Sequence, residues 1–276
     1  MSLAPAALPE LNEEYALTAD HIAAYQRQGH VYLPHLLSPH EVAAYRPVIN
    51  HAADAYNTES RPMEERDTYG KAFLQIMNLW TKDEAVRRYV FARRFAKIAT
   101  ELMGVSGVRL YHDQALFKEP GGGPTPWHQD QYYWPLGTDN TITMWMPLVD
   151  VPDEVGTMTF ATGSREMGFL GDFEISDESD KVFENIVKDN GLQLHNYGGM
   201  KAGDATFHSG WTLHGAPGNP TANMREVMTI IYFADETKVT DPGDNPHRSN
   251  DLRTWLPGLK AGDLAASELN PLLYRK

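Results

Sequence analysis

Residues 204–234, DATFHSGWTLHGAPGNPTANMREVMTIIYFA, place two short segments rich in β-branched and aromatic residues on either side of a turn-rich stretch. Thr, Val, Ile, Phe and Tyr favour strands, whereas Gly, Pro and Asn between such runs favour turns. Comparable segments occur earlier in the chain, at 108–118, 141–151 and 156–163. This part of the sequence therefore predicts a core of short antiparallel strands.

The first hundred residues show a different period, which is typical of helices. Thr18 and Ser38 are expected to be helix N-caps, the latter in the capping box SPHE, and Gly29 and Gly104 are expected to stop helices. The pattern predicts helices over 19–28, from Pro39 onward and, as one long element, over 83–103, with strands at 31–34 and 72–80 and a polar loop at 57–70. Helices followed by many strands indicate a helical flank packed on a β-sandwich or jelly roll.

We expect one domain over 1–276 with three consecutive parts: a helical flank with the first strands at 1–104, a jelly-roll core at 105–235 and a tail packed on the core at 236–276. Residues 166–200 form a long acidic insertion between two core strands. Insertions of this length are typical of lids or binding loops. The most acidic part of the insertion, 171–185, is interpreted as a solvated loop.

The composition argues against several classes of protein. The net charge is −13, which is unsuited to binding nucleic acid or an anionic membrane surface. No apolar run approaches the roughly 18 residues of a membrane span, and the first residues lack the pattern of a signal peptide, so a cytoplasmic protein is expected. The chain has no cysteine, which leaves His, Asp and Glu as the side chains for any metal site.

One pair of such side chains lies in PTPWHQDQYYWPL, residues 124–136. His128 and Asp130 are two residues apart and would point to the same face of a strand. The pair is the only His-x-acid match in the chain, but 11 His and 37 acidic residues in 276 positions give about one or two by chance. Taken alone, it is equally consistent with a metal site and with a chance pair.

A third ligand would come from a later strand, and both His208 and His214 are candidates. Two His and one carboxylate on one face of an iron leave three positions open for a 2-oxoacid and O2. Arg225 follows His214 by 11 residues, and Arg matches a carboxylate with two parallel hydrogen bonds. A hairpin over the intervening turn residues would return the next strand beside His214, with Arg225 near its start.

These segments together resemble the phytanoyl-CoA dioxygenase-like family of Fe(II)- and 2-oxoglutarate-dependent oxygenases. The resemblance covers most of the chain and is carried by LTADHIAAYQRQGHVYLPHLLSPHEV (17–42), FKEPGGGPTPWHQDQYYWPL (117–136), MWMPLVDVPDEVGTMTFATGSR (144–165) and KAGDATFHSGWTLHGAPGNPTANMR (201–225). The last segment is the most specific, because His214 and Arg225 fall at the family's spacing. In ATGSR, residues 161–165, the Pro and His of the family's Pro-Gly-Ser-His turn are replaced.

The resemblance implies a mainly β protein with flanking helices and a double-stranded β-helix core, the jelly-roll or cupin-like fold. It also implies Fe(II), the cosubstrate 2-oxoglutarate and O2 as cofactors. On the family's pattern, His128, Asp130 and His214 are the metal ligands, and Arg225 binds the 5-carboxylate of 2-oxoglutarate.

Several further residues are candidates for the site. Trp145 matches a family aromatic beside the iron and cosubstrate, although core packing accounts for it equally well. Gln114 and Lys118 share a strand face and would reach the cosubstrate or substrate, but an exposed edge explains them too. Four aromatic residues flank the ligands and are candidates for the substrate pocket: Tyr132, Tyr133, Trp134 and Trp211.

The function that this resemblance implies is hydroxylation of a small organic molecule, with release of succinate and CO2. Desaturation, epoxidation and ring formation stay open, whereas Asp130 speaks against halogenation, which uses a small residue at that position. The alternative from another class is a non-redox metal-binding cupin, such as an isomerase or a binding module, which has no need of Arg225. We expect a monomer or weak homo-oligomer with a small-molecule substrate.

Overall fold

The structure, a computed structural model, describes residues 8–155 and 157–276. Two antiparallel sheets pack against each other in it, which confirms the predicted jelly roll. The large sheet runs β1 (His30–Leu33), β8 (Ala205–Ser209), β5 (Thr141–Pro147), β10 (Val227–Ala234), β3 (Gly107–Phe117) and β11 (Leu272–Arg275), with β2 (Leu74–Met77) also paired to β3. The small sheet runs β4 (Thr125–His128), β9 (His214–Ala216), β6 (Thr159–Ala161) and β7 (Leu194–Asn196).

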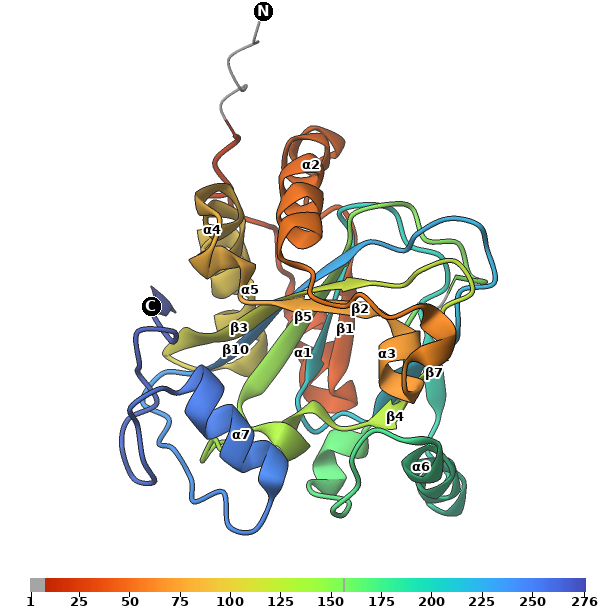
Figure 1. The fold of residues 1–276 in the computed structure, drawn as a ribbon. Helices are drawn as coiled ribbons and strands as arrows, with labels where there is room; N and C mark the ends of the chain where they lie inside the picture. Colours follow the sequence, from red (N-terminus) through yellow and green to blue (C-terminus); the bar gives the residue numbers. More distant parts are fainter. Residues whose placement is uncertain (1–7, 156) are drawn as a thin grey trace, which may run out of the picture.

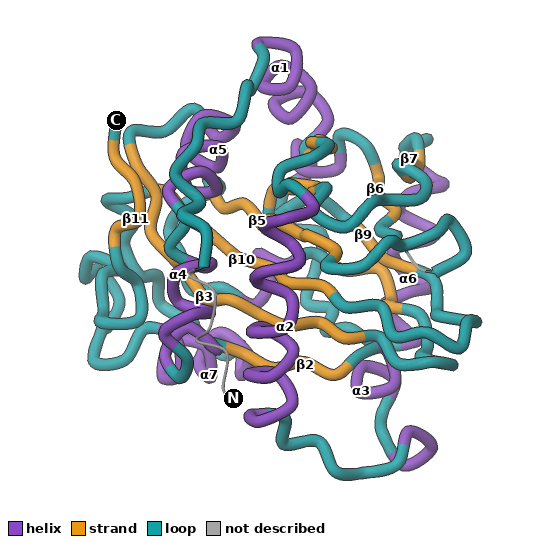
Figure 2. The backbone as a smooth tube through the Cα atoms, turned by 90° about the horizontal axis from the view of Figure 1, so that it is seen from above, coloured by secondary structure: helices purple, strands orange, loops and turns teal. Residues whose placement is uncertain are grey.

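Seven α-helices surround the sheets in the described part of the chain: α1 (Ala19–Gln28), α2 (Pro39–Tyr56), α3 (Thr68–Ala72), α4 (Glu84–Val90), α5 (Arg93–Met103), α6 (Asp177–Asp189) and α7 (Pro246–Trp255). In Figure 1, α2 and α4 lie on one side of the large sheet, and α6 and α7 lie on the other. Seen from above in Figure 2, α2 crosses over the strands of the large sheet. Within the described residues, no helix combines the length and the apolar character needed to cross a membrane.

The strand register of the large sheet gives its two faces different characters. Two neighbouring rows of side chains cross the face that is turned toward the small sheet, namely His112–Ile231–Thr143–His208 and Gln114–Thr229–Trp145–Thr206. Most of these side chains line a cavity between the sheets. The inner face is therefore a polar and aromatic wall, built from four adjacent strands.

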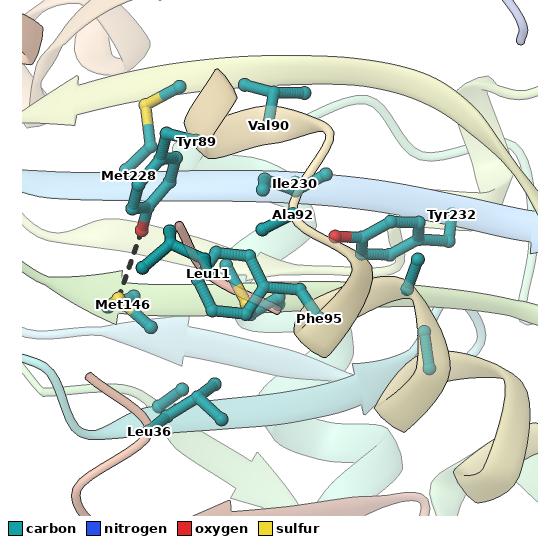
Figure 3. Close-up of a cluster of buried hydrophobic side chains, with 14 of the residues drawn as sticks. Leu11, Leu36, Tyr89, Val90, Ala92, Phe95, Met146, Met228, Ile230 and Tyr232 are labelled. Atoms are coloured by element: carbon teal, nitrogen blue, oxygen red, sulfur yellow. Dashed lines mark hydrogen bonds between the residues drawn. The ribbon is translucent and has the colours of Figure 1, made fainter. Parts of the chain in front are cut away.

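The opposite face of the large sheet is apolar, and the helices of the N-terminal flank pack on it. Met146, Met228 and Ile230 project from β5 and β10 and pack with Tyr89 of α4 and Phe95 of α5 (Figure 3). The Tyr89 hydroxyl donates to Met146 Sδ at 3.0 Å. This close-packed face holds in place the strands whose other side carries the polar wall.

The connection between His214 and Arg225 joins the two sheets, so the hairpin predicted over it is wrong. β9 pairs with β4 and β6, whereas β10 pairs with β3 and β5. The buried amide of Asn219 holds this connection by donating to the carbonyls of Lys118 at 3.1 Å and Asn223 at 2.7 Å. Arg225 then exchanges two backbone hydrogen bonds of 2.9 Å with Lys118 just before β10 begins.

The helix starts predicted at Thr18 and Ser38 are confirmed, since both residues cap helices. The single helix predicted over 83–103 is wrong, because α4 and α5 are separated at Phe91 and Ala92. The chain has no Gly or Pro at this break. A tertiary contact anchors the first turn of α5: the buried guanidinium of Arg94 donates to both carboxylate oxygens of Glu41, at 3.1 and 2.8 Å.

Both polar segments that were predicted as loops contain helical structure. The segment 57–70 includes a 3-10 turn (Met63–Glu65) and the start of α3, which is capped by Asp67. The acidic segment 171–185 includes most of α6, which begins at the capping box of Ser176 and buries Phe183 and Val187. The acidic composition led to the prediction of a loop, although the apolar residues of α6 fall at the spacing of an amphipathic helix.

The C-terminal residues contribute α7, which packs beside the inner wall. Asn245 caps this helix, and Pro246 occupies its first turn. Trp255, near the end of α7, packs on the cluster that contains Tyr111 of β3 and Trp134. Through these contacts α7 supplies side chains to the cavity between the sheets.

Replacing the buried ring of Phe95 should destabilise the protein strongly. Phe95→Ala should lower the free energy of unfolding by about 3–5 kcal/mol, because it leaves a cavity between the helices and the apolar face of the large sheet. Phe169→Ala is the matched control, since Phe169 is 49% exposed and its loss should change stability by less than about 0.5 kcal/mol. Urea denaturation measures both values, and equal midpoints for the two variants would contradict this account of the core.

Candidate metal centre

The two sheets bring His128, Asp130 and His214 together. His128 ends β4 and lies directly opposite His214 of β9, with 4.2 Å between the ring centroids. Asp130 follows in a 3-10 turn (Asp130–Tyr133), and its Oδ1 lies 3.5 Å from His128 Nε2 and 3.9 Å from His214 Nε2. One ligand atom from each of the three residues lies within 4.8 Å of the other two. The strand ends earlier than expected, but His128 and Asp130 still face the same space.

Backbone carbonyls fix the orientation of both rings. His128 Nδ1 donates to Pro126 O, and His214 Nδ1 donates to Thr212 O, each at 2.8 Å. Because a carbonyl only accepts hydrogen bonds, Nδ1 carries the proton and Nε2 keeps its lone pair. Burial lowers the pKa of His214 well below its usual range, and the neighbouring His128 and His208 lower it further. Both Nε2 atoms are therefore directed at Asp130 as metal-binding donors.

Asp130 has one carboxylate oxygen free to face the histidines, because the other is held from the large sheet. Its Oδ2 accepts from Thr143 Oγ1 at 2.9 Å and from His208 Nε2 at 3.2 Å. Burial alone would raise the pKa of Asp130, but His214, His128 and His208 hold it well below its usual range. The carboxylate is therefore ionised and oriented, as a metal ligand requires.

His208 lies beside this cluster but presents a different group to it. Since a carboxylate only accepts, His208 Nε2 donates its proton to Asp130 and has no lone pair on that side. This geometry favours His214 over His208 as the third donor. Two imidazoles and one carboxylate that converge in this way fit Fe(II) at a facial triad.

A second feature of the site is a pair of buried cationic side chains, Arg225 and Lys118. Arg225 is 2% exposed, lines the cavity and lies over the ring of Trp145, 5.4 Å from its centroid. Burial lowers the pKa of Arg225 to about 9. Burial and the nearby charge of Arg225 lower the pKa of Lys118 to about 7. A region that disfavours positive charge in this way would gain from a bound anion.

Gln114 and Lys118 occupy different positions relative to the cavity. Gln114 lines it, accepts from Gln75 Nε2 at 2.9 Å and lies 3.3 Å from His112 Nδ1. Lys118 is fully buried behind the wall, where its Nζ donates to the carbonyl of Gly123. Neither residue lies on an exposed edge, so that interpretation is wrong for both.

A cavity of about 630 Å³ extends from the metal cluster between the sheets. Of the four aromatic candidates, Tyr133 and Trp134 line it. Tyr132 instead packs against Tyr133, 4.9 Å away between ring centroids, and Trp211 donates from Nε1 to Asp139 at 2.7 Å. The structure therefore brings two of the four aromatic residues to the cavity.

Several lining residues were missed because they lie in segments interpreted as loop, insertion or tail. They come from α3, from the acidic insertion and from α7, and include Tyr69, Glu174, Ile175, His247, Asp251 and Trp255. The helix signals of Asn245 with Pro246 and of Ser176 were available in the sequence. A helix signal says nothing about which cavity the helix will reach.

The jelly roll, the convergent His and Asp donors and the buried arginine define the class of non-haem iron oxygenases that use 2-oxoglutarate. A family model described as phytanoyl-CoA dioxygenase (PhyH) matches residues 25–227, and the chain belongs to this family. This confirms the resemblance seen in the sequence.

Curated relatives have related activities. L-proline trans-4-hydroxylase of Streptomyces griseoviridis is 25% identical over 244 residues, which cover 81% of this chain and 88% of the relative. Ectoine dioxygenase of Streptomyces avermitilis is 23% identical, with 84% of each chain covered.

Solved structures agree in fold. The non-haem α-ketoglutarate-dependent carbocyclase SnoK from nogalamycin biosynthesis has a TM-score of 0.74 and 26% identity, covering 93% of this chain and 96% of its own. The epimerase SnoN, solved with Fe3+, α-ketoglutarate and nogalamycin RO, has a TM-score of 0.72 and 27% identity, covering 92% of this chain and 98% of its own. The protein is an Fe(II)- and 2-oxoglutarate-dependent oxygenase, with iron, 2-oxoglutarate and O2 as its cofactors.

The choice between the two histidines can be tested by metal binding. His214→Ala should weaken Mn(II) binding at least about 100-fold, because it removes one of three donors. His208→Gln keeps a donor for Asp130 and should change the Kd by less than about tenfold. Isothermal titration with Mn(II) gives both constants. The reverse order of effects would show that His208 is the ligand.

The buried position of Arg225 predicts that this side chain contributes to the affinity for 2-oxoglutarate. Arg225→Ala should weaken 2-oxoglutarate binding by about 2–4 kcal/mol, the cost of breaking one side of a desolvated charge pair. Arg225→Lys should recover only part of it, since an ammonium cannot form two parallel hydrogen bonds. Arg27→Ala, at an exposed position, is the control. Titration of the Mn(II)-loaded variants measures each Kd, and an unaltered value for Arg225→Ala would exclude this role.

Proposed function

We propose that the protein hydroxylates a small organic molecule, with His128, Asp130 and His214 holding Fe(II) and Arg225 holding the 5-carboxylate of 2-oxoglutarate. The convergence of the three donors beside a buried arginine is the observation that carries this proposal. When bound, iron and 2-oxoglutarate activate O2, so that 2-oxoglutarate becomes succinate and CO2 and one oxygen atom enters the substrate.

The chain's own contribution begins with orientation. Pro126 and Thr212 fix the tautomers of the two histidines through their carbonyls, and Thr143 and His208 hold the outer oxygen of Asp130. Hydrogen bonds of this kind keep ligands in position when metal or cosubstrate enters, and their loss typically costs about 10–100-fold in metal affinity or activity.

The second contribution is the binding site for 2-oxoglutarate. Arg225 and Trp145 lie at the end of the inner wall formed by β10 and β5, with Thr229 between Trp145 and Gln114 across the sheet. A guanidinium that is already desolvated and stacked on an indole loses little freedom when it binds a carboxylate. Gln114 would contact the cosubstrate directly, whereas the buried Lys118 would act through its charge.

The third contribution is enclosure of the reacting substrate. Ile175 of the insertion donates its backbone N–H to the Tyr133 hydroxyl at 2.9 Å, and Glu174 pairs with His247 of α7 at 2.8 Å. These contacts close the insertion and α7 over one side of the cavity. We propose that this side receives the substrate and excludes water during the reaction.

Sister reactions use the same cofactors, and the structural relatives include a carbocyclase and an epimerase. The products distinguish them: hydroxylation adds one oxygen atom, whereas desaturation and ring formation remove two hydrogens. A non-redox cupin would leave the buried Arg225 without a function at the cavity wall.

Conversion of 2-oxoglutarate to succinate tests the proposal. The Fe(II)-loaded protein should form succinate slowly without substrate, and Asp130→Ala should lower this rate at least about 100-fold at saturating iron, since it removes a ligand and its charge. Asp54→Ala, on the exposed side of α2, is the control and should retain the rate.

Near wild-type succinate formation by Asp130→Ala would show that the His128–Asp130 pair is not the metal site. Absence of succinate in the wild-type protein, with iron and 2-oxoglutarate both bound, would favour a non-redox cupin. Compounds that stimulate succinate formation are then candidate substrates, and mass spectrometry of their products identifies the reaction.

A further inference from the structure

The charges that line the cavity are unevenly distributed. Arg225 is the only Lys or Arg among the described lining residues, whereas four carboxylates line the same space: Asp67, Asp130, Glu174 and Asp251. On the proposed function, Asp130 and Arg225 are committed to Fe(II) and 2-oxoglutarate. The charges of the ion, the two carboxylates of the cosubstrate, Asp130 and Arg225 then cancel. The part of the cavity left for the substrate is consequently acidic.

Two of the remaining carboxylates already have roles at the rim. Asp67 is exposed and caps α3 by accepting from Gly70 N at 2.7 Å. Glu174 is also exposed and pairs with His247 Nε2 at 2.8 Å. Both side chains are exposed, so water screens their charges more than it screens the charge of the partly buried Asp251. Asp251 is therefore the one of these carboxylates whose role in the cavity needs an explanation.

Asp251 is partly buried in the cavity wall and is held there by a neutral group. The Tyr111 hydroxyl donates to its Oδ2 at 2.9 Å, and Trp255 lines the cavity one turn further along the same helix. In the described part of the chain, no Lys, Arg or His forms an ion pair with it. Burial raises the pKa of Asp251 to about 7. This one donor leaves carboxylate lone pairs that a ligand can use.

Aromatic rings surround the same space. Tyr69 of α3, Tyr133 and Trp255 of α7 all line the cavity. Burial raises the pKa of Tyr69, and Tyr133, Asp130 and Asp251 raise it further. Aromatic faces beside a carboxylate favour an organic cation, through the negative potential of the rings.

We infer that the substrate carries a positively charged nitrogen, as a primary, secondary or quaternary amine, and that Asp251 is its counterion between the rings of Tyr69, Tyr133 and Trp255. This inference rests on the proposed function for the position of the metal and cosubstrate. It adds the class of substrate, because Asp251 would hold the cationic end while another part of the molecule faces Asp130 and the histidines.

Desolvation supplies the physical reason for selectivity. A carboxylate in this position has lost much of its hydration, and an ammonium group restores the lost stabilisation. A neutral hydroxyl restores only part of it, and a second carboxylate repels. The site should consequently rank ligands of equal size by charge, in the order cation, neutral, anion.

Matched probes test this ranking without knowledge of the natural substrate. Cyclohexylammonium, cyclohexanol and cyclohexanecarboxylate are titrated into protein loaded with Mn(II) and 2-oxoglutarate, at pH 8, and relaxation of their protons by Mn(II) shows whether they bind near the metal. Cyclohexylammonium should bind at least about tenfold more tightly than cyclohexanol, which is about 1.4 kcal/mol. Cyclohexanecarboxylate should bind more weakly than both.

Asp251→Asn should abolish the preference for the cation while Mn(II) and 2-oxoglutarate bind as in the wild type. Asp172→Asn is the matched control, since it removes one charge from an exposed position of the insertion that does not line the cavity, and it should keep the preference. Equal binding of the cation and the alcohol to the wild-type protein would overturn the inference, as would a preference that survives in Asp251→Asn. Succinate formation is measured separately, so a protein that forms succinate but lacks cation preference refutes this inference alone.

Discussion

The antiparallel pairing of β4 with β9 is the constraint on which the site depends, because it sets His128 opposite His214. A shift of one residue in this pairing would turn one of the two rings to the other face of the small sheet. The chain then leaves β4 in a 3-10 turn, which brings Asp130 back toward both rings. Thr143 and His208 of the large sheet hold the far oxygen of Asp130, so these hydrogen bonds also connect the candidate metal site to the large sheet.

The two faces of the large sheet affect the stability of the fold in opposite ways. The outer face buries Phe95, Tyr89 and their neighbours in a dry core, and burial of this kind is the main source of stability. The inner face carries groups that are costly to bury, above all Arg225 and Lys118. Burial lowers the pKa of both groups, and the charge of Arg225 lowers that of Lys118 further, so their positive charges are disfavoured there. On the proposed function, the 5-carboxylate of 2-oxoglutarate offsets this cost at Arg225, which links cosubstrate binding to the stability of the site.

The sequence predicts most of this core because periodicity and ligand chemistry are local signals. Strand composition located β3, β5, β8 and β10, and the His-x-Asp pair with a later His and Arg identified the class of site. The sheet to which a strand belongs is not local information, so the connection from His214 to Arg225 was predicted as a hairpin when it is a crossover. The pair Arg94–Glu41, which anchors the first turn of α5, joins residues far apart in the chain, and the break before α5 carries no Gly or Pro.

Substrate recognition is hardest to read from the sequence, because its residues come from the segments with the weakest patterns. Tyr69, Glu174 and Asp251 lie on a short helix, in an acidic insertion and in the C-terminal tail, far apart in the chain. Such segments vary freely in a jelly roll because they carry none of the strand pairing. The strands therefore define the cofactor chemistry, while the covering segments define the charge of the molecule that is admitted. Asp251 of α7 accepts from the hydroxyl of Tyr111 of β3, and this contact is where these two parts of the protein meet.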